Sequence, residues 1–165
     1  MATYDITQLH TLEHDTSDGF NSLVKIDDTH YILAYTGDGY DGYIKTFSID
    51  SNYNITELHT LEHDTSDGNY NSLVKIDDTH YILTYSGYGD DGYIKTFSID
   101  SNYNITQIDS LEHDTKQGIY NSLVKIDDTH FILAYTGDGY DGYIKTFFVD
   151  AGIATTNTTN FFQFI

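Results

Sequence analysis

The residues best suited to chemistry lie in a short Gly, Asp and Tyr loop that occurs three times. The loop reads TGDGYDG at residues 36–42, SGYGDDG at 86–92 and TGDGYDG again at 136–142. A tyrosine ring can pack on the C–H groups of a sugar while a carboxylate accepts hydrogen bonds from its hydroxyls. The loops therefore predict glycan binding, with the candidate residues Asp38, Tyr40, Asp41, Tyr88, Asp90, Asp91, Asp138, Tyr140 and Asp141.

Two other interpretations of these loops stay open. Glycine permits a tight turn, and aspartate side chains in such a turn often bond their own backbone. Calcium is the second alternative, because it takes six to eight oxygen ligands from carboxylates and carbonyls. The spacing of Asp38 and Asp41 is not that of an EF-hand, and the second loop moves one acidic residue. We therefore predict no cofactor, with calcium as the alternative.

A second repeated group pairs histidine with aspartate. Its members are His14, Asp15, Thr16, His63, Asp64, Thr65, His113, Asp114 and Thr115. Histidine and aspartate could form a general base and its orienting group, but no serine or cysteine stands out as a nucleophile. Three near-equal copies are also the wrong number for one active site. We expect a structural role for this group and no enzymatic activity.

Three further histidines, His30, His80 and His130, each follow an Asp-Asp-Thr turn. Hydrogen bonding to the backbone is the expected role for such histidines, rather than metal binding. Zinc would require several copies to converge on the axis of a symmetric oligomer, and nothing in the spacing demands this. No metal site is predicted.

The elements that must position these groups come from a tandem repeat. Residues 21–50 recur at 71–100 with four differences in thirty positions, and at 121–150 with three differences. The predicted domain is residues 1–150, with repeats at about 4–53, 53–103 and 103–150, followed by a tail at 151–165. The period and the element count of a repeat define its architecture.

Each repeat predicts four short strands joined by Gly, Asp and Asn turns. In the first repeat they are an outer strand at Tyr4–Asp15, an inner strand at Ser22–Ile26, a second strand at His30–Tyr35 and a third at Tyr43–Ile49. The outer strand has counterparts at Tyr53–Asp64 and Tyr103–Asp114. The second strand is apolar on both faces, with Ile32 and Ala34 on one side and Leu33 on the other. It should therefore lie in a sheet packed between two other sheets.

Three such repeats predict an all-β fold and allow a β-propeller, a single-chain β-trefoil or a β-prism. The repeat resembles a propeller blade with inner strand NSLVKI, second strand HYILAY, third strand GYIKTF and outer strand ITELHTLEHD. It lacks the Gly-His and Trp-Asp of WD40 repeats, the paired glycines of kelch repeats and the full acidic signature of integrin-type calcium blades. The resemblance implies three four-stranded blades per chain, with the His-Asp-Thr group tying each outer-to-inner loop to a neighbouring turn.

The order of the strands predicts a dimer. The sequence opens with an outer strand, and its third repeat stops at the third strand, Tyr143–Val149. Three blades cannot close a ring, but two chains related by a twofold axis can form six blades. In that dimer the Ile6–His14 strand of one chain pairs with the partner's Tyr143–Val149, which also protects sheet edges from aggregation. The chain itself is therefore the expected partner.

The tail departs from the repeat and carries an aromatic cluster, Phe161, Phe162, Phe164 and Ile165. Such a cluster should not stand in water. It is expected to cap its own chain or, alternatively, to insert into a neighbouring molecule and build an oligomer or filament.

The net charge of the chain further limits the classes of molecule that it is expected to bind. The chain has 26 acidic residues and 7 basic ones, a net charge of −19, so nucleic acid and anionic membranes are poor partners. There are no cysteines, which excludes disulfides and thiol chemistry. The N-terminal residues show no basic and apolar leader, and no apolar run could span a bilayer, so we expect a soluble chain without a signal peptide or transmembrane segment. The compartment is not predicted.

These features favour a non-enzymatic, multivalent binding module that recognises a neutral or cationic glycan through several weak sites. The alternative is a structural protein that assembles through its terminal strands and aromatic tail.

Overall fold

A computed structural model describes residues 4–17 and 19–150 of the chain, and its regular structure consists of strands and three short 3-10 turns. The first sheet contains β1 (Ser22–Lys25), β2 (His30–Thr36), β3 (Gly42–Ile49) and β4 (Ile55–Asp64). The second contains β5 (Asn69–Lys75), β6 (His80–Ser86), β7 (Gly92–Ile99) and β8 (Ile105–Asp114). The third contains β9 (Ile119–Lys125), β10 (His130–Thr136) and β11 (Gly142–Phe148). The 3-10 turns are η1 (Asp38–Tyr40), η2 (Tyr88–Asp90) and η3 (Asp138–Tyr140).

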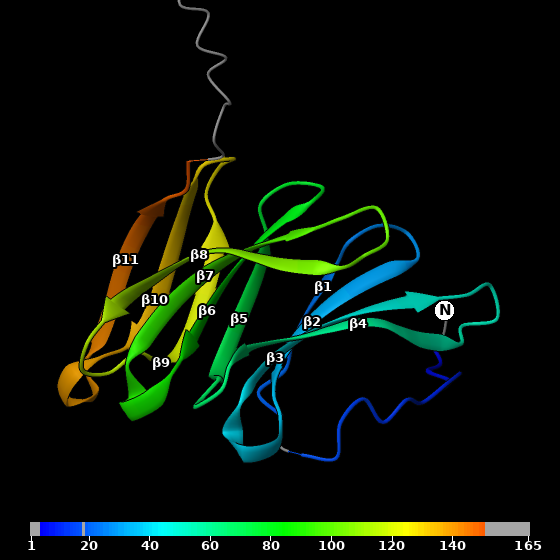
Figure 1. Cartoon of the computed structure of the whole chain (residues 1–165), viewed down its shortest axis with the longest axis horizontal. Helices are drawn as coiled ribbons and strands as arrows, with labels where there is room; N and C mark the ends of the chain where they lie inside the picture. Colours follow the sequence, from blue (N-terminus) through cyan, green and yellow to red (C-terminus); the bar gives the residue numbers. More distant parts are fainter. Residues whose placement is uncertain (1–3, 18, 151–165) are drawn as a thin grey trace, which may run out of the picture.

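Three strands of each antiparallel sheet come from one predicted repeat, and in the first two sheets the outer strand of the next repeat is added, with the strands in chain order. The first two sheets have four strands, and the third has three in the described part of the chain. The sheets lie side by side, and the inner strands β1, β5 and β9 are neighbours (Figure 1). The prediction of an all-β chain with repeated sheets is confirmed.

The cores lie between the sheets, because each central strand is apolar on both faces. Tyr81, Ile82 and Leu83 of β6, in the second sheet, are all buried, as predicted for a strand between two layers. One cluster joins the first sheet to the second, and it includes Ile32, Ile44, Tyr81, Leu83 and Phe97. A second cluster joins the second sheet to the third, and it includes Ile82, Ile94, Phe131 and Leu133.

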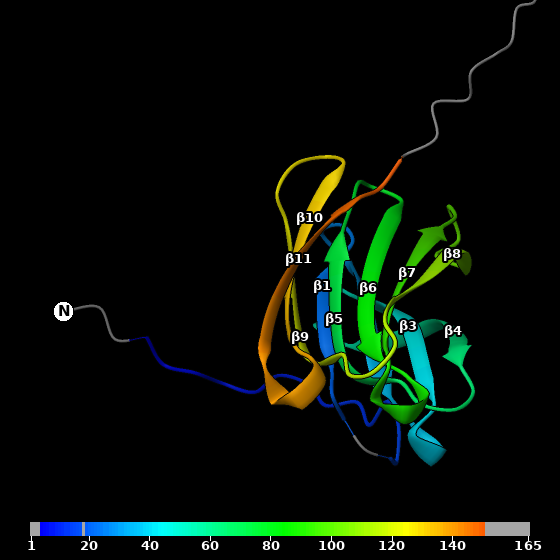
Figure 2. The ribbon, with the colours of Figure 1, turned by 90° about the vertical axis from the view of Figure 1, so that its left-hand side faces the viewer.

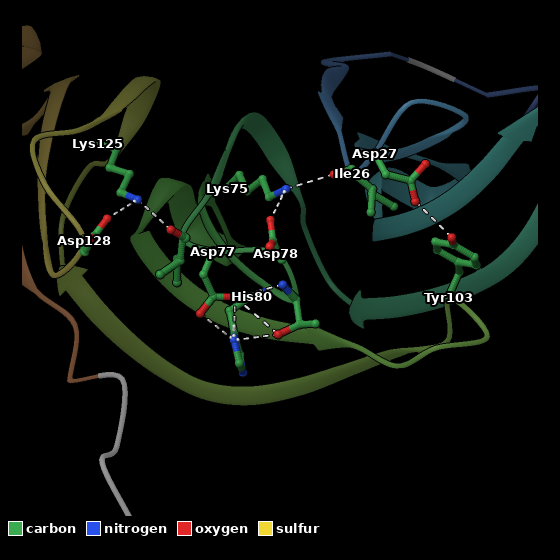
Figure 3. Close-up of polar contacts among 11 residues, drawn as sticks. Ile26, Asp27, Lys75, Asp77, Asp78, His80, Tyr103, Lys125 and Asp128 are labelled. Carbon is green, nitrogen blue, oxygen red and sulfur yellow. Dashed lines mark hydrogen bonds and ion pairs between the residues drawn. The ribbon is translucent and has the colours of Figure 1, made fainter.

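The same polar bonds recur at both junctions and fix how neighbouring sheets are placed. The backbone N–H of Leu73 donates to Ser22 Oγ at 2.9 Å, and that of Leu123 donates to Ser72 Oγ at 2.9 Å. Likewise, Lys75 Nζ donates to the carbonyl of Ile26 at 2.9 Å, and Lys125 Nζ donates to that of Ile76 at 2.7 Å (Figure 3). The second sheet therefore relates to the third much as the first relates to the second.

The predicted outer strand at Tyr4–Asp15 is not a strand in this chain. Residues 4–13 are largely exposed and run away from the sheets (Figure 2). Their counterpart β4 pairs along its length with β3, which precedes it in the sequence. In the described chain, residues 4–15 pair with no strand, although this segment has the sequence of an outer strand.

Two further predictions concern the C-terminal tail and membrane-spanning segments. The aromatic tail, with its candidate assembly residues Phe161, Phe162, Phe164 and Ile165, lies outside the described residues. None of the helical turns in the described part has the length and apolar character needed to span a bilayer.

A close approach between two glycines sets the spacing of the first two sheets. Gly68 packs against Gly42, and a Cβ on Gly68 would overlap the Cα and N atoms of Gly42. Backbone atoms cannot move aside as a flexible side chain can. Gly68 N also donates to the carbonyl of Tyr40 at 2.8 Å, so a shift would strain that bond as well.

We predict that Gly68→Ala lowers the free energy of unfolding by about 2–4 kcal/mol, because the added methyl group must push two sheets apart. Urea unfolding followed by tyrosine fluorescence would measure the loss. Ser66→Ala in the same loop is the control, since this side chain is exposed, and it should stay within about 0.5 kcal/mol of the parent. Equal stability of the two variants would contradict the close approach.

Candidate functional site

The predicted glycan-binding loops connect the second and third strands of each sheet, and each is closed by its own backbone. In the first loop Gly37 N donates to Asp41 O at 2.9 Å and Tyr40 N to Gly37 O at 3.2 Å. Gly39 has φ +70°, a conformation that glycine adopts without strain, and Tyr40 follows with φ 71°. The turn leaves the side chains of Tyr40, Tyr88 and Tyr140 exposed.

The exchange of Asp38 and Tyr40 for Tyr88 and Asp90 keeps the fold of the loop. The residue after the central glycine has a positive φ in every copy, and Asp90 at φ 68° adopts the same conformation as Tyr40. Aspartate tolerates this region well. The exchange therefore moves the exposed ring from one side of the turn to the other.

The loop carboxylates do not close the turns themselves. Within the described residues, the side chains of Asp38, Asp41, Asp90 and Asp91 make no hydrogen bond to their own backbone, so the self-bonded aspartate turn is not what closes these loops. Asp138 pairs with Lys116 at 2.7 Å, but both groups are exposed, so solvent screens the attraction between them.

Sequence reasoning missed a row of aromatic rings beside the loops. Phe20, Tyr70 and Tyr120 pack against each other across the sheets, with ring centroids 4.6 Å apart at both contacts. All three have positive φ, between 51° and 54°, which is strained for a bulky residue. The available signal was an aromatic residue directly before the asparagine that opens each repeat.

These rings lie at the same end of the molecule as the loops. Burial raises the pKa of Tyr70, and the neighbouring Tyr120 and the charge of Asp90 raise it further, with a smaller contribution from Tyr140. Asp90 and Tyr140 belong to the second and third loops. An aromatic row and acidic loops thus share one surface.

No metal centre emerges from either set of candidates. Among residues 4–17 and 19–150, no group of three or more histidine and acidic side chains is arranged to hold a metal ion. The calcium alternative for the loops gains no support.

The His-Asp-Thr groups sit at the junctions between sheets. His63 and Asp64 end β4 of the first sheet, where the hydroxyl of Tyr85 donates to Asp64 at 2.7 Å and the His63 ring packs edge-on against Tyr85 at 4.8 Å. Lys95 Nζ donates to the carbonyl of His63. All four partners lie at the boundary between the first sheet and the second.

The same unit occurs at each sheet. Tyr135 donates to Asp114 at 2.7 Å and Lys145 to the His113 carbonyl at 2.5 Å. At the first sheet the unit is built by His14, Asp15, Tyr35 and Lys45, with Tyr35 donating to Asp15 at 2.9 Å. The N-terminal segment is therefore anchored at Asp15 although residues 4–13 join no sheet.

The buried histidines are neutral packing groups. Burial and the charge of Lys95 lower the pKa of His63 to about 3, and burial and Lys145 lower that of His113 to about 4. Neither ring nitrogen of His63 has a hydrogen-bond partner in the structure. This arrangement offers no base with an orienting carboxylate.

The three histidines that follow the Asp-Asp-Thr turns bind a side chain rather than only backbone, which corrects the expectation for them. His30 Nδ1 lies 2.9 Å from Asp27, which also accepts from the backbone N–H of Thr29 at 2.8 Å. His80 and His130 make the same contact with Asp77 and Asp127.

Because the pKa of His63 is low in the folded chain, stability should fall with acid. Below pH about 6.5 the unfolded chain protonates this histidine while the folded chain does not, so unfolding gains protons and becomes easier. We expect a loss of about 1–3 kcal/mol between pH 6.5 and 4.5. Urea midpoints at several pH values would show a weaker dependence for His63→Gln, whereas the exposed His10→Gln should behave as the parent. Equal slopes for the parent and His63→Gln would contradict the argument.

Comparison with known proteins identifies the fold alone. No protein-family model and no curated protein matches this sequence. Among solved structures, a periplasmic gluconolactonase from Pseudomonas aeruginosa superposes with a TM-score of 0.59 at 11% identity, over 77% of this chain and 39% of that one. The NanB sialidase of Streptococcus pneumoniae, as its K499G mutant, gives a TM-score of 0.60 at 14% identity, over 82% of this chain and 23% of that one.

The chain therefore spans less than two fifths of the length of either structure. Both are β-propellers, and the three repeated sheets here have the same kind of arrangement. The propeller expectation is supported over the β-trefoil and β-prism alternatives, and the chain has a β-propeller-like fold.

Proposed function

We propose that this chain is the subunit of a non-enzymatic, multivalent binding protein, in which two copies close a six-bladed ring and present six near-equivalent loops at one end. One observation carries the proposal. β11 has no strand on its outer edge in the described chain, while residues 4–13 have an outer-strand sequence and no sheet. Each copy would supply the strand that the other needs.

The pairing seen in the first two sheets defines the register of this exchange. In the first sheet Ser48 lies opposite Thr56 and Ile49 opposite Ile55, and the second sheet repeats the pattern. Carried to the third sheet, the pattern places Phe148 opposite the partner's Thr7 and Val149 opposite the partner's Ile6. Ile6 is fully exposed in the single chain.

The two end faces of the chain are apolar and complementary. On the first sheet Leu23 is 62% exposed, whereas its equivalent Leu73 is 4% exposed beneath the preceding sheet. On the third sheet Ile144 is 71% exposed, whereas Ile44 is 0% exposed beneath the following sheet. Burying one such side chain contributes about 1.5–3 kcal/mol, so joining the two faces supplies a large driving force.

The polar groups of these faces also match. At each internal junction a serine hydroxyl accepts a backbone N–H and a lysine donates to a carbonyl, as described above. On the third sheet, the Ser122 hydroxyl and the Ile126 carbonyl are the equivalent acceptors. On the first sheet, the Leu23 backbone N–H and the Lys25 side chain are the equivalent donors. Lys25 now pairs with exposed Asp28, as Lys125 pairs with Asp128 while binding Ile76. A closed ring would repeat one junction six times.

The first test is the mass of the native particle. We expect two chains by native mass spectrometry and light scattering, with dissociation favoured at low salt because each chain carries a charge of −19. Removing residues 1–13, which keeps the His14–Asp15 anchor, should give a monomer. A monomeric parent protein would overturn the ring.

The register can be tested with cysteines, since the chain has none. Facing residues in an antiparallel pair are about 4.5–5.5 Å apart, within reach of a disulfide. The double variant Thr7→Cys, Phe148→Cys should oxidise to a covalent dimer on a non-reducing gel. Thr7→Cys with Ile144→Cys, out of register, should not. A series of larger covalent multimers on the gel would mean that strands are exchanged along an open chain of molecules. That result would favour the structural, self-assembling alternative.

The ligand we propose is a neutral or cationic glycan bound by the loops. Exposed Tyr40, Tyr88 and Tyr140, the loop carboxylates and the aromatic row of Phe20, Tyr70 and Tyr120 share one end of the molecule. Aromatic rings with adjacent hydrogen-bond acceptors suit a sugar. Several linked weak sites would act through avidity.

On a glycan array, the parent protein should bind a subset of glycans, and one loop change such as Tyr40→Ala should weaken binding about threefold to tenfold. The triple change of Tyr40, Tyr88 and Tyr140 to Ala should abolish it. A matched triple change of Asp28, Asp78 and Asp128 to Asn, at the other end of the sheets, should not. Equal binding by the two triple variants would exclude the loops as the site.

A further inference from the structure

A tyrosine closes the junction between the first two sheets at the end opposite the loops. The ring of Tyr103 stacks on His30, with centroids 3.7 Å apart and planes 15° apart, and its hydroxyl donates to Asp27 at 2.9 Å. Thr46 Oγ1 donates to the carbonyl of Tyr103 at 2.9 Å. A ring stack, a hydroxyl bond and a backbone bond thus hold this one residue, and Figure 3 shows the hydroxyl bond.

The residues that contact Tyr103 have counterparts at the junction between the second and third sheets, but there no tyrosine covers them in the described chain. His80 Nδ1 lies 2.9 Å from Asp77, as His30 does from Asp27 (Figure 3). The side chain of His80 is nevertheless 42% exposed, against 19% for His30. A cavity of about 210 Å³ opens beside it, lined by Ile76, Asp77, His80, Thr96, Ile108 and Val149.

The sequence indicates which residue belongs in this cavity. Tyr103 lies two residues before Ile105, the first residue of β8. The corresponding residue of the third repeat is Ile153, which has neither a ring nor a hydroxyl group. The N-terminal segment, by contrast, has Tyr4 two residues before Ile6, and Tyr4 is 94% exposed.

We propose that the cavity at His80 is the binding site for Tyr4 of a second copy of this chain. The phenol ring stacks on His80, its hydroxyl donates to Asp77, and Thr96 donates to the tyrosine carbonyl. The inference rests on the proposed ring, because strand exchange sets the partner's Ile6 opposite Val149, a residue that lines the cavity. Tyr4 then reaches His80 as Tyr103 reaches His30.

The third sheet has an equivalent site, which would also take a tyrosine from the second copy. His130 and Asp127 pair at 2.9 Å, and the His130 side chain is 49% exposed. Its tyrosine would be the partner's Tyr53, which is exposed here and has φ 65°, close to the 63° of Tyr103. A closed ring therefore uses each of the three tyrosines and each of the three histidine sites once per chain.

The test is the proton spectrum of the His80 ring in the full chain, assigned with a His80→Asn variant. A ring stacked on tyrosine shows upfield-shifted signals, so His80 should resemble His30, whose tyrosine is in the same chain. Tyr4→Ala should move His80 downfield and leave His30 unchanged. Tyr4→Phe should keep the upfield shift but raise the dimer Kd roughly tenfold for each site, because a hydroxyl bond to a carboxylate is lost.

The outcomes separate this site from the ring itself. A dimer in which Tyr4→Ala leaves His80 unchanged overturns the tyrosine site and leaves the ring standing. A monomeric protein overturns both the ring and the tyrosine site. This holds even if the His80 signal of the monomer responds to Tyr4→Ala, because that response would come from a contact within one chain. Ile153→Ala is the matched control for the other occupant, and a change of the His80 signal in that variant would assign the cavity to the chain's own residue and overturn the proposal.

Discussion

The whole architecture depends on sheets that are apolar on both faces. A strand such as β2 buries Ile32 and Ala34 on one side and Leu33 and Tyr35 on the other, so one sheet alone would leave half of its core in water. The second sheet is therefore covered on both faces, by the first sheet and by the third. A linear stack of three always leaves two such faces bare, and ring closure is the arrangement that removes both without adding a capping element.

Burial of apolar faces holds two sheets together but does not fix their relative orientation. Polar contacts at the ends of the sheets fix that orientation. At the loop end, Asp64, Tyr85 and Lys95 bind across the junction around the neutral ring of His63. At the other end, Tyr103 bonds to Asp27 and stacks on His30. The junction between the first two sheets is therefore held at both ends, which fixes the orientation of these two sheets and the spacing of their loops. Constant spacing is what a multivalent binding surface requires.

The sequence was sufficient for features that lie within one repeat. Apolar residues on both faces of His30–Tyr35 predicted a buried central strand, and Gly/Asp turns predicted the limits of each sheet. Features that depend on contact between repeats could not be predicted this way. The aromatic row of Phe20, Tyr70 and Tyr120 and the stack of Tyr103 on His30 join residues about fifty or more positions apart, and no local pattern distinguishes such rings from ordinary surface tyrosines. The segment at Tyr4–Asp15 failed as a predicted strand for a related reason, since a strand forms only beside a partner edge.

Strand exchange also changes how the chain would respond to its concentration. If the outer strand followed β11, as β8 follows β7, the third sheet would be complete within one molecule. In the proposed ring, by contrast, completing the third sheet would be a binding event, and its free energy would depend on chain concentration. In that ring each chain would both give and receive a strand, so the second exchange within a pair would be intramolecular and far more favourable than the first. Closed pairs are then preferred over open polymers at moderate concentration, despite the strong mutual repulsion of two acidic chains.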